Sequence, residues 1–75
     1  MSERPKQQPF AYITRHYGVT PVVGQRVRHT VTKECGVVKR EGSGGVPGHY
    51  VPVQFDGRRF ASPCHPQELE PAHDR

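Results

Sequence analysis

The stretch YVPVQFDGRRFAS, residues 50–62, decides the fold. Apolar side chains alternate with polar or proline positions from Val51 to Phe55, which is the period of a β-strand with one buried face. Asp56-Gly57 then predicts a two-residue hairpin turn of type I′, because both central positions of that turn need a positive φ. The chain is expected to return as a strand through residues 58–62, with Phe60 facing the core.

Three further segments carry the pattern of short strands. Around Val27 the period is again two, so Arg26 and Arg28 lie on the opposite, outward face. Residues 36–40 predict a second strand, and residues 68–70 predict a last one after a single helical turn. Short strands at this spacing, with turn residues between them, are typical of a small barrel, here of five strands.

A short helix is expected before the barrel. Phe10, Ile13 and Tyr17 share one helical face. Pro9 suits the first helical position, and Gly18 is a good C-terminal stop. A helix of about two turns is too short to be stable alone in water, so its apolar face must dock on the barrel. The sequence therefore predicts a mostly β fold with one short N-terminal helix.

These patterns also set the predicted boundaries. Residues 1–8 are interpreted as a disordered arm, residues 9–71 as the barrel with its helix, and residues 72–75 as a frayed tail. Pro52 cannot donate to a sheet ladder, so its strand either lies at an edge or donates only from its other positions. Residues 42–48 contain four glycines and predict a flexible loop. The predicted core consists of Val27, Val37, Val51, Val53, Phe55, Phe60 and Leu69.

The charge of the chain favours an anionic partner. Lys and Arg number 11 against 7 Asp and Glu, which gives a net charge of +4. The positive excess lies in the predicted barrel, whereas the last residues are acidic. No apolar stretch has the pattern of a signal peptide or a membrane span. We therefore expect a cytoplasmic protein without membrane association, whose two cysteines are free thiols.

The runs Gly24–His29, Gly36–Val38 and Val53–Gly57 follow the order found in small SH3-like barrels of the KOW type, which the chain resembles. The whole chain is more similar still to a group of short phage and prophage proteins. The further matching motifs are Tyr17-Gly18-Val19, His65-Pro66 and Glu68-Leu69-Glu70. The likeness covers about residues 12–71 and implies a small five-stranded SH3-like barrel, without implying a particular activity. The insertion at residues 42–48 departs from the pattern of the group.

Basic side chains on the outside of the barrel are the main candidates for a binding site. Phosphates need several cations on one surface, and strands fix the spacing of such cations. A tyrosine beside them can stack on a base. A solvated surface that keeps sheet edges from aggregating, or a site for an acidic protein, are the alternatives. The candidate nucleic-acid-binding residues, called the basic face below, are Arg26, Arg28, Lys39, Arg40, Tyr50, Arg58 and Arg59.

Metal binding and catalysis are not expected. Cys35 and Cys64 lie 29 residues apart and lack the paired spacing of structural zinc sites, although His65 with His29 or His49 offers further ligands. Cys64 and His65 are neighbours on a strand, so they point to opposite faces and cannot act as nucleophile and base. We expect no cofactor, no small-molecule substrate and no enzymatic activity.

The sequence leaves two functions open. The first is a non-enzymatic phage-type accessory protein that binds nucleic acid through the basic face, with little sequence preference. The second is a protein–protein interaction module, such as a virion or host-directed factor, that uses Tyr50, the loop at residues 42–48 or the apolar helix face. In either case we expect a monomer.

Overall fold

The computed structural model describes residues 10–72. The predicted disordered arm, the predicted first helical residue Pro9 and the predicted tail beyond Ala72 lie outside these residues. The elements in chain order are α1 (Ala11–Tyr17), β1 (Arg26–His29), β2 (Cys35–Val38), the 3-10 turn η1 (Ser43–Gly45), β3 (Val51–Phe55), β4 (Ser62–Cys64), the 3-10 turn η2 (Pro66–Glu68) and β5 (Leu69–Pro71).

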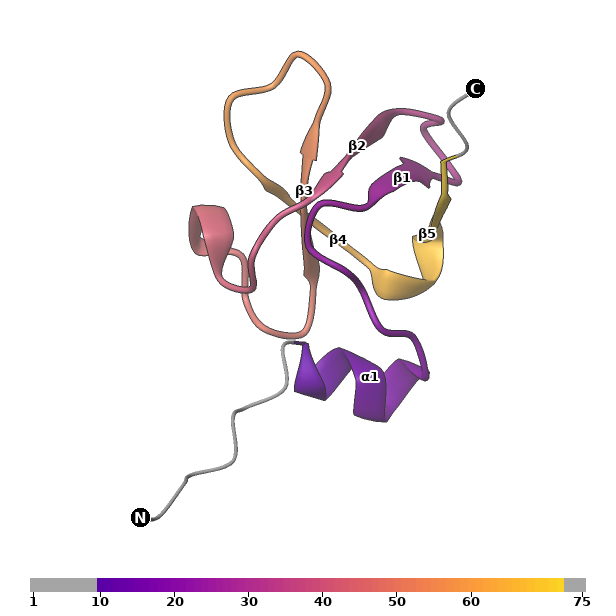
Figure 1. Ribbon diagram of the computed structural model, residues 1–75, viewed down its shortest axis with the longest axis vertical. Helices are drawn as coiled ribbons and strands as arrows, with labels where there is room; N and C mark the ends of the chain where they lie inside the picture. The colour runs from indigo at the N-terminus through magenta and orange to yellow at the C-terminus, as the bar shows by residue number, and fades with distance from the viewer. Residues whose placement is uncertain (1–9, 73–75) are drawn as a thin grey trace.

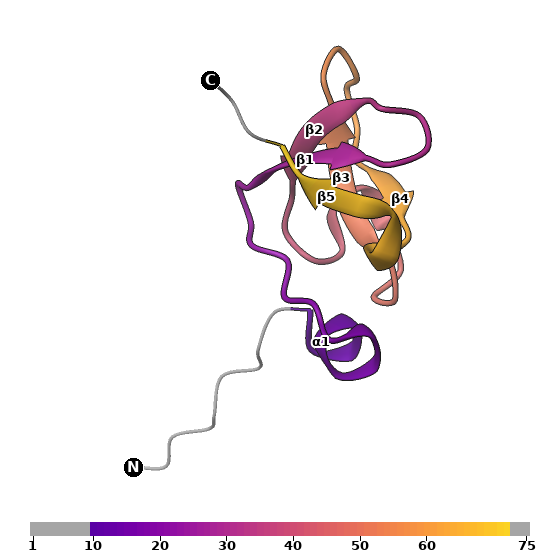
Figure 2. The same ribbon diagram turned by 90° about the vertical axis from the view of Figure 1, so that its right-hand side faces the viewer.

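The five strands form one antiparallel sheet in the order β4-β3-β2-β1-β5. The sheet curls into a half-barrel, and α1 lies at one end of it (Figures 1 and 2). The prediction of a mostly β, five-stranded SH3-like barrel with a short N-terminal helix is confirmed.

The core lies where the inner face of the sheet meets α1. Phe10 and Ile13 are completely buried, and Tyr17 packs against the same cluster, so the predicted apolar residues dock on the sheet. The prediction that Phe10 lies on the helix is wrong, because α1 begins at Ala11 and Phe10 precedes it with φ 60° and ψ 35°, in the left-handed region. Gly18 ends the helix at φ 74°, a left-handed conformation that glycine adopts readily, and its N–H donates to the Thr14 carbonyl at 3.0 Å. The buried members of the core cluster are Phe10, Ile13, Val27, Val38, Val51, Val53, Phe55 and Cys64, with Tyr17 and Leu69 partly buried beside them.

The prediction of which side chains of β2 face the core is wrong by one residue. Val38 is buried, whereas Val37, predicted in the core, is half-buried on the other face. Gly36 lies opposite Phe55 on the core side, and Val38 shares that side because side chains alternate along a strand. Two adjacent valines offer an apolar side chain to either face, so the sequence pattern does not choose between them.

The predicted inward position of Phe60 is also wrong, since the side chain is 70% exposed. β4 begins only at Ser62, so residues 56–61 form a loop in place of the predicted two-residue turn (Figure 1). Gly57 has φ 83°, whereas the φ of Asp56 is not positive. A type I′ turn needs a positive φ at both central residues, so this turn is of another type. Phe60 therefore lies on the loop before pairing resumes.

β3 is an interior strand, with β2 on one side and β4 on the other. Pro52 lies opposite Pro63, and its carbonyl accepts the Lys39 N–H at 2.9 Å, so the strand bonds through its other positions and through carbonyl groups. β2 and β3 approach so closely that a Cβ on Gly36 would lie 2.5 Å from the Gln54 carbonyl oxygen. Only glycine fits this position without moving a strand.

The glycine-rich connection between β2 and β3 packs against the rest of the fold. Val46, which the sequence did not place in the core, is 5% exposed. Glu41 Oε1 accepts the Phe10 N–H at 3.0 Å, which ties the connection to the residue before α1. The hydrogen bond of Glu41 therefore links this connection to the start of α1.

Candidate nucleic-acid interface

The residues of the predicted basic face come from three places in the fold. The prediction that Arg58 and Arg59 lie on a strand is wrong, because both belong to the β3–β4 loop. The three groups are Arg26 with Arg28 on β1, Arg58 with Arg59 in the β3–β4 loop, and Lys39 with Arg40 and Tyr50 in the β2–β3 connection.

Arg26 is held by a carboxylate from the far side of β2. Its Nη1 lies 2.8 Å from Asp56 Oδ1 and its Nη2 lies 3.1 Å from Asp56 Oδ2, a bidentate arrangement. Because Arg26 pairs with Val37 on β2 and Asp56 follows β3, the arginine side chain spans the outer face of β2. The hydrogen bond from Arg26 is the main cause that lowers the pKa of Asp56.

Two other arginines are also paired with carboxylates from distant parts of the chain. Arg28 lies opposite Glu70 in the β1–β5 ladder, and its Nε donates to Glu70 Oε2 at 2.6 Å. Arg58 Nη2 lies 3.2 Å from Glu34 Oε2, and its guanidinium sits 6.0 Å from the centre of the Phe55 ring. Three of the predicted cations are therefore neutralised in place.

Other cations in residues 10–72 have no carboxylate to balance their charge. In residues 10–72 every carboxylate has a partner: three bind arginines, Glu68 approaches His29 at 3.4 Å, and Glu41 accepts a backbone N–H. Five cations of this part of the chain have no carboxylate within ion-pair distance, namely Arg15, Lys33, Lys39, Arg40 and Arg59.

Four aromatic rings meet where α1 faces the end of the β2–β3 connection. Tyr12 and His16, one turn apart on α1, stack with ring centres 4.0 Å apart. His49 meets Tyr12 edge-on at 6.2 Å and lies tilted on Tyr50 at 4.5 Å. Tyr12 is 47% exposed, so the rings form a surface cluster. Sequence reasoning selected Tyr50 and missed the other three, although the four-residue spacing of the two α1 rings was visible.

Three of the unbalanced cations belong to the same two elements as these rings, α1 and the β2–β3 connection. Arg15 precedes His16 on α1. Arg40 leads into Glu41, whose carboxylate holds the chain just before α1. Lys39 is joined through its N–H to the first half of β3 at 2.9 Å. We call the combined set the α1 surface: Tyr12, Arg15, His16, Lys39, Arg40, His49 and Tyr50.

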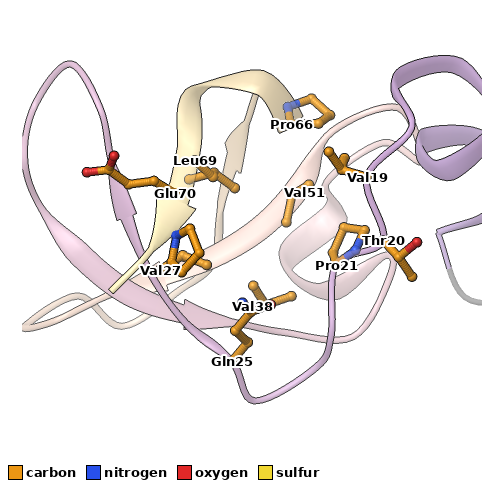
Figure 3. Close-up of a pocket in the computed structure, with 11 residues that line it drawn as sticks. Val19, Thr20, Pro21, Gln25, Val27, Val38, Val51, Pro66, Leu69 and Glu70 are labelled. Carbon is orange, nitrogen blue, oxygen red and sulfur yellow. The ribbon is translucent and has the colours of Figure 1, made fainter. Parts of the chain in front are cut away.

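An apolar cavity of about 190 Å³ opens beside the linker between α1 and β1. Figure 3 shows Val27, Val51 and Leu69 around the opening, with Pro21 of the linker opposite. The Glu70 carboxylate points away from it, toward its arginine partner on β1. The cavity can accept one apolar group of modest size, and it offers few polar partners.

The cysteines are separate from both features. Cys64 is buried in the core, and its burial, with a smaller contribution from Glu68, raises its pKa to about 11. The side chain of His65 caps η2, because its Nδ1 accepts the Gln67 N–H at 3.1 Å. Cys35 is also a free thiol. Within residues 10–72 no group of three or more His, Cys, Asp or Glu side chains gathers in a way that could hold a metal ion.

Two further findings bear on the function. None of the helices described for residues 10–72 is long and apolar enough to cross a membrane. Comparison of the chain with protein-family models, with curated proteins and with solved structures finds no match.

Proposed function

We propose that this chain is a non-enzymatic nucleic-acid-binding protein, an accessory protein of the phage type that its motifs resemble, and that it holds phosphates through the α1 surface. The observation that carries the proposal is the distribution of charge. Within residues 10–72 the carboxylates are all engaged, whereas Arg15, Lys39 and Arg40 have no carboxylate partner and lie on the two elements that carry the cluster of exposed rings.

The arginines of β1 are weaker candidates than the sequence indicated. A phosphate that approaches Arg26 or Arg28 meets an ion pair that is already formed with Asp56 or Glu70. An exposed pair of this kind contributes only about 0–1 kcal/mol, so breaking it costs little. The displaced carboxylate nevertheless stays close to the bound phosphate and repels it, so little net attraction results.

Phosphate contacts predict a particular salt dependence. Three cations that neutralise three phosphates give a slope of log affinity against log salt of roughly −2 for a single strand and −3 for a duplex. Sequence preference should be low, because phosphate contacts carry no base information.

The test is a salt titration of a fluorescein-labelled 20-nucleotide strand, read by fluorescence anisotropy, with two charge-matched double variants. Lys39→Ala with Arg40→Ala should flatten the single-strand slope by about 1.4. Arg26→Ala with Arg28→Ala removes the same charge and should leave the slope almost unchanged. Absence of binding at 20 mM salt, or equal losses in the two variants, would overturn the proposal.

A second candidate function is protein interaction, which the apolar cavity beside Pro21 favours. Its size and lining suit one apolar side chain of an extended partner peptide. Selection of a random peptide library on the intact chain, with Leu69→Lys as the counter-selected control, tests this candidate. Selected peptides should share one apolar position, and peptides that bind both proteins equally would contradict the cavity as their site.

A further inference from the structure

The ring cluster of the α1 surface joins two elements and stays partly exposed. Tyr12 and His16 stack with an interplanar angle of 30°, and the rings of His49 and Tyr50 continue the group across the gap between two elements. Tyr12 remains 47% exposed and His16 and His49 are exposed as well. Tyr17, by contrast, packs against the core and meets His65 edge-on at 5.1 Å.

The cluster is also held in place from both sides. At α1, Ile13 and Phe10, the residue just before the helix, are completely buried next to the ring-bearing positions. On the other side, Val51 follows Tyr50 directly and is 1% exposed at the start of β3. The hydrogen bond of 3.0 Å from the Phe10 N–H to Glu41 joins the two halves. The rings are thus fixed by buried neighbours while part of their surface faces solvent.

Exposed rings beside unbalanced cations match the needs of one class of ligand. Every nucleobase offers a flat face that stacks on an aromatic side chain, and its phosphate needs a cation nearby. In a duplex the base faces are already covered by neighbouring pairs, whereas in a single strand they are available. We propose that Tyr12, His16, His49 and Tyr50 form a stacking site for unpaired bases, so that single-stranded DNA or RNA is the ligand of the α1 surface. This inference rests on the proposed function and narrows it.

The intact chain carries its own reporter for this stacking. It contains three tyrosines and no tryptophan, and two of the tyrosines belong to the cluster. Titration with ten-nucleotide oligothymidylate, with oligouridylate and with a ten-base-pair duplex should quench tyrosine emission with the single strands alone. The single strands should bind at least about tenfold more tightly than the duplex at equal salt, because stacking adds to the phosphate contacts.

Three variants separate stacking from charge and from folding. Tyr12→Leu should weaken single-strand binding by about 5- to 100-fold without changing the salt slope, whereas Tyr12→Phe should keep the affinity. Tyr17→Phe is the control and should keep both affinity and quenching. Thermal unfolding shows whether Tyr12→Leu is folded; if it is not, His16→Leu, at the partner ring of the same stack, takes its place.

The outcomes distinguish the two proposals. Equal affinity for duplex and single strands, with folded Tyr12→Leu or His16→Leu binding as the parent does, would overturn the stacking site and leave nucleic-acid binding intact. Failure of all three probes to bind at 20 mM salt would overturn both.

Discussion

Replacement of Gly36 by alanine measures how closely β2 and β3 approach. The added Cβ would lie 2.5 Å from the Gln54 carbonyl oxygen and 2.8 Å from the Cα of Phe55. Both are backbone atoms of an interior strand, so no side-chain rotation relieves the contact. To reach an ordinary separation of 3.4 Å the strands must move apart by about 0.9 Å. Such a movement weakens the ladder at the centre of the sheet.

The energetic cost has two opposing parts. Overpacking costs about 1–3 kcal/mol, and more where the backbone has to move. Removing glycine flexibility from the unfolded chain returns about 0.4–1 kcal/mol. Because the atoms in the way are backbone atoms, the overpacking cost lies at the upper end of its range, so we expect a net loss of about 2 kcal/mol in the free energy of unfolding. The total for a chain of this size is roughly 4–11 kcal/mol.

The assay is urea denaturation followed by circular dichroism. Gly48→Ala is the matched control, since its Cβ would meet only a flexible side-chain oxygen of Glu41 at 3.4 Å. It should change the free energy of unfolding by less than about 0.5 kcal/mol. If Gly36→Ala is as stable as Gly48→Ala, the close approach of the two strands is refuted.

Three further substitutions or reagents test the core, the thiols and the ion pairs. Phe10→Ala should lower the free energy of unfolding by about 3–5 kcal/mol, whereas Phe60→Ala should change it by less than about 0.5 kcal/mol; similar losses in urea denaturation would contradict their opposite exposures of 0% and 70%. Iodoacetamide at pH 8 should modify Cys35 much faster than Cys64. Burial raises the pKa of Cys64 to about 11, so only about one thousandth of the Cys64 side chains are thiolate at this pH. Equal rates of modification of the two cysteines, measured by mass spectrometry, would contradict this. Glu70→Gln should release its arginine partner on β1 and steepen the single-strand salt slope by about 0.7, and an unchanged slope would show that the ion pair does not mask that arginine.

Sequence periodicity predicted the inner face of β3 correctly, although Pro52 on the opposite face is buried as well. Val51, Val53 and Phe55 alternate with other residues, and all three are buried in β3 as expected. The same reasoning found the residues that dock α1, namely Ile13, Tyr17 and Phe10, although Phe10 precedes the helix. In both cases burial of one face is the dominant energy, and the period reports that face directly.

Periodicity failed where the local pattern was compatible with two answers. Val37 and Val38 are both apolar, so only the pairing of Gly36 with Phe55 decides which valine enters the core. Phe60 was placed inward by assuming a two-residue turn, yet pairing resumes only at Ser62. Loop length is set by contacts across the sheet, and these are absent from a local reading of the sequence.

The candidate site depends on contacts that are even more distant along the chain. The carboxylates that neutralise Arg26, Arg28 and Arg58 lie 30, 42 and 24 residues away in sequence. Counting charges found the positive excess, but the register of the sheet decides which cations remain unbalanced. The sequence showed that the last residues are acidic, but it did not indicate the pairing of Asp56 and Glu70 with particular arginines.

Docking of α1 couples the stability of the fold to the α1 surface. α1 has seven residues, too few for a stable helix in water, so its structure depends on the burial of Phe10 and Ile13. The same docking brings Tyr12 to His49. Local opening of the helix would therefore separate Tyr12 from His49 and expose Phe10 and Ile13. A ligand that stacks on rings of both α1 and the β2–β3 connection binds only the form in which α1 is docked. Its binding must therefore stabilise the docked helix, by the free energy gained from contacting the rings together.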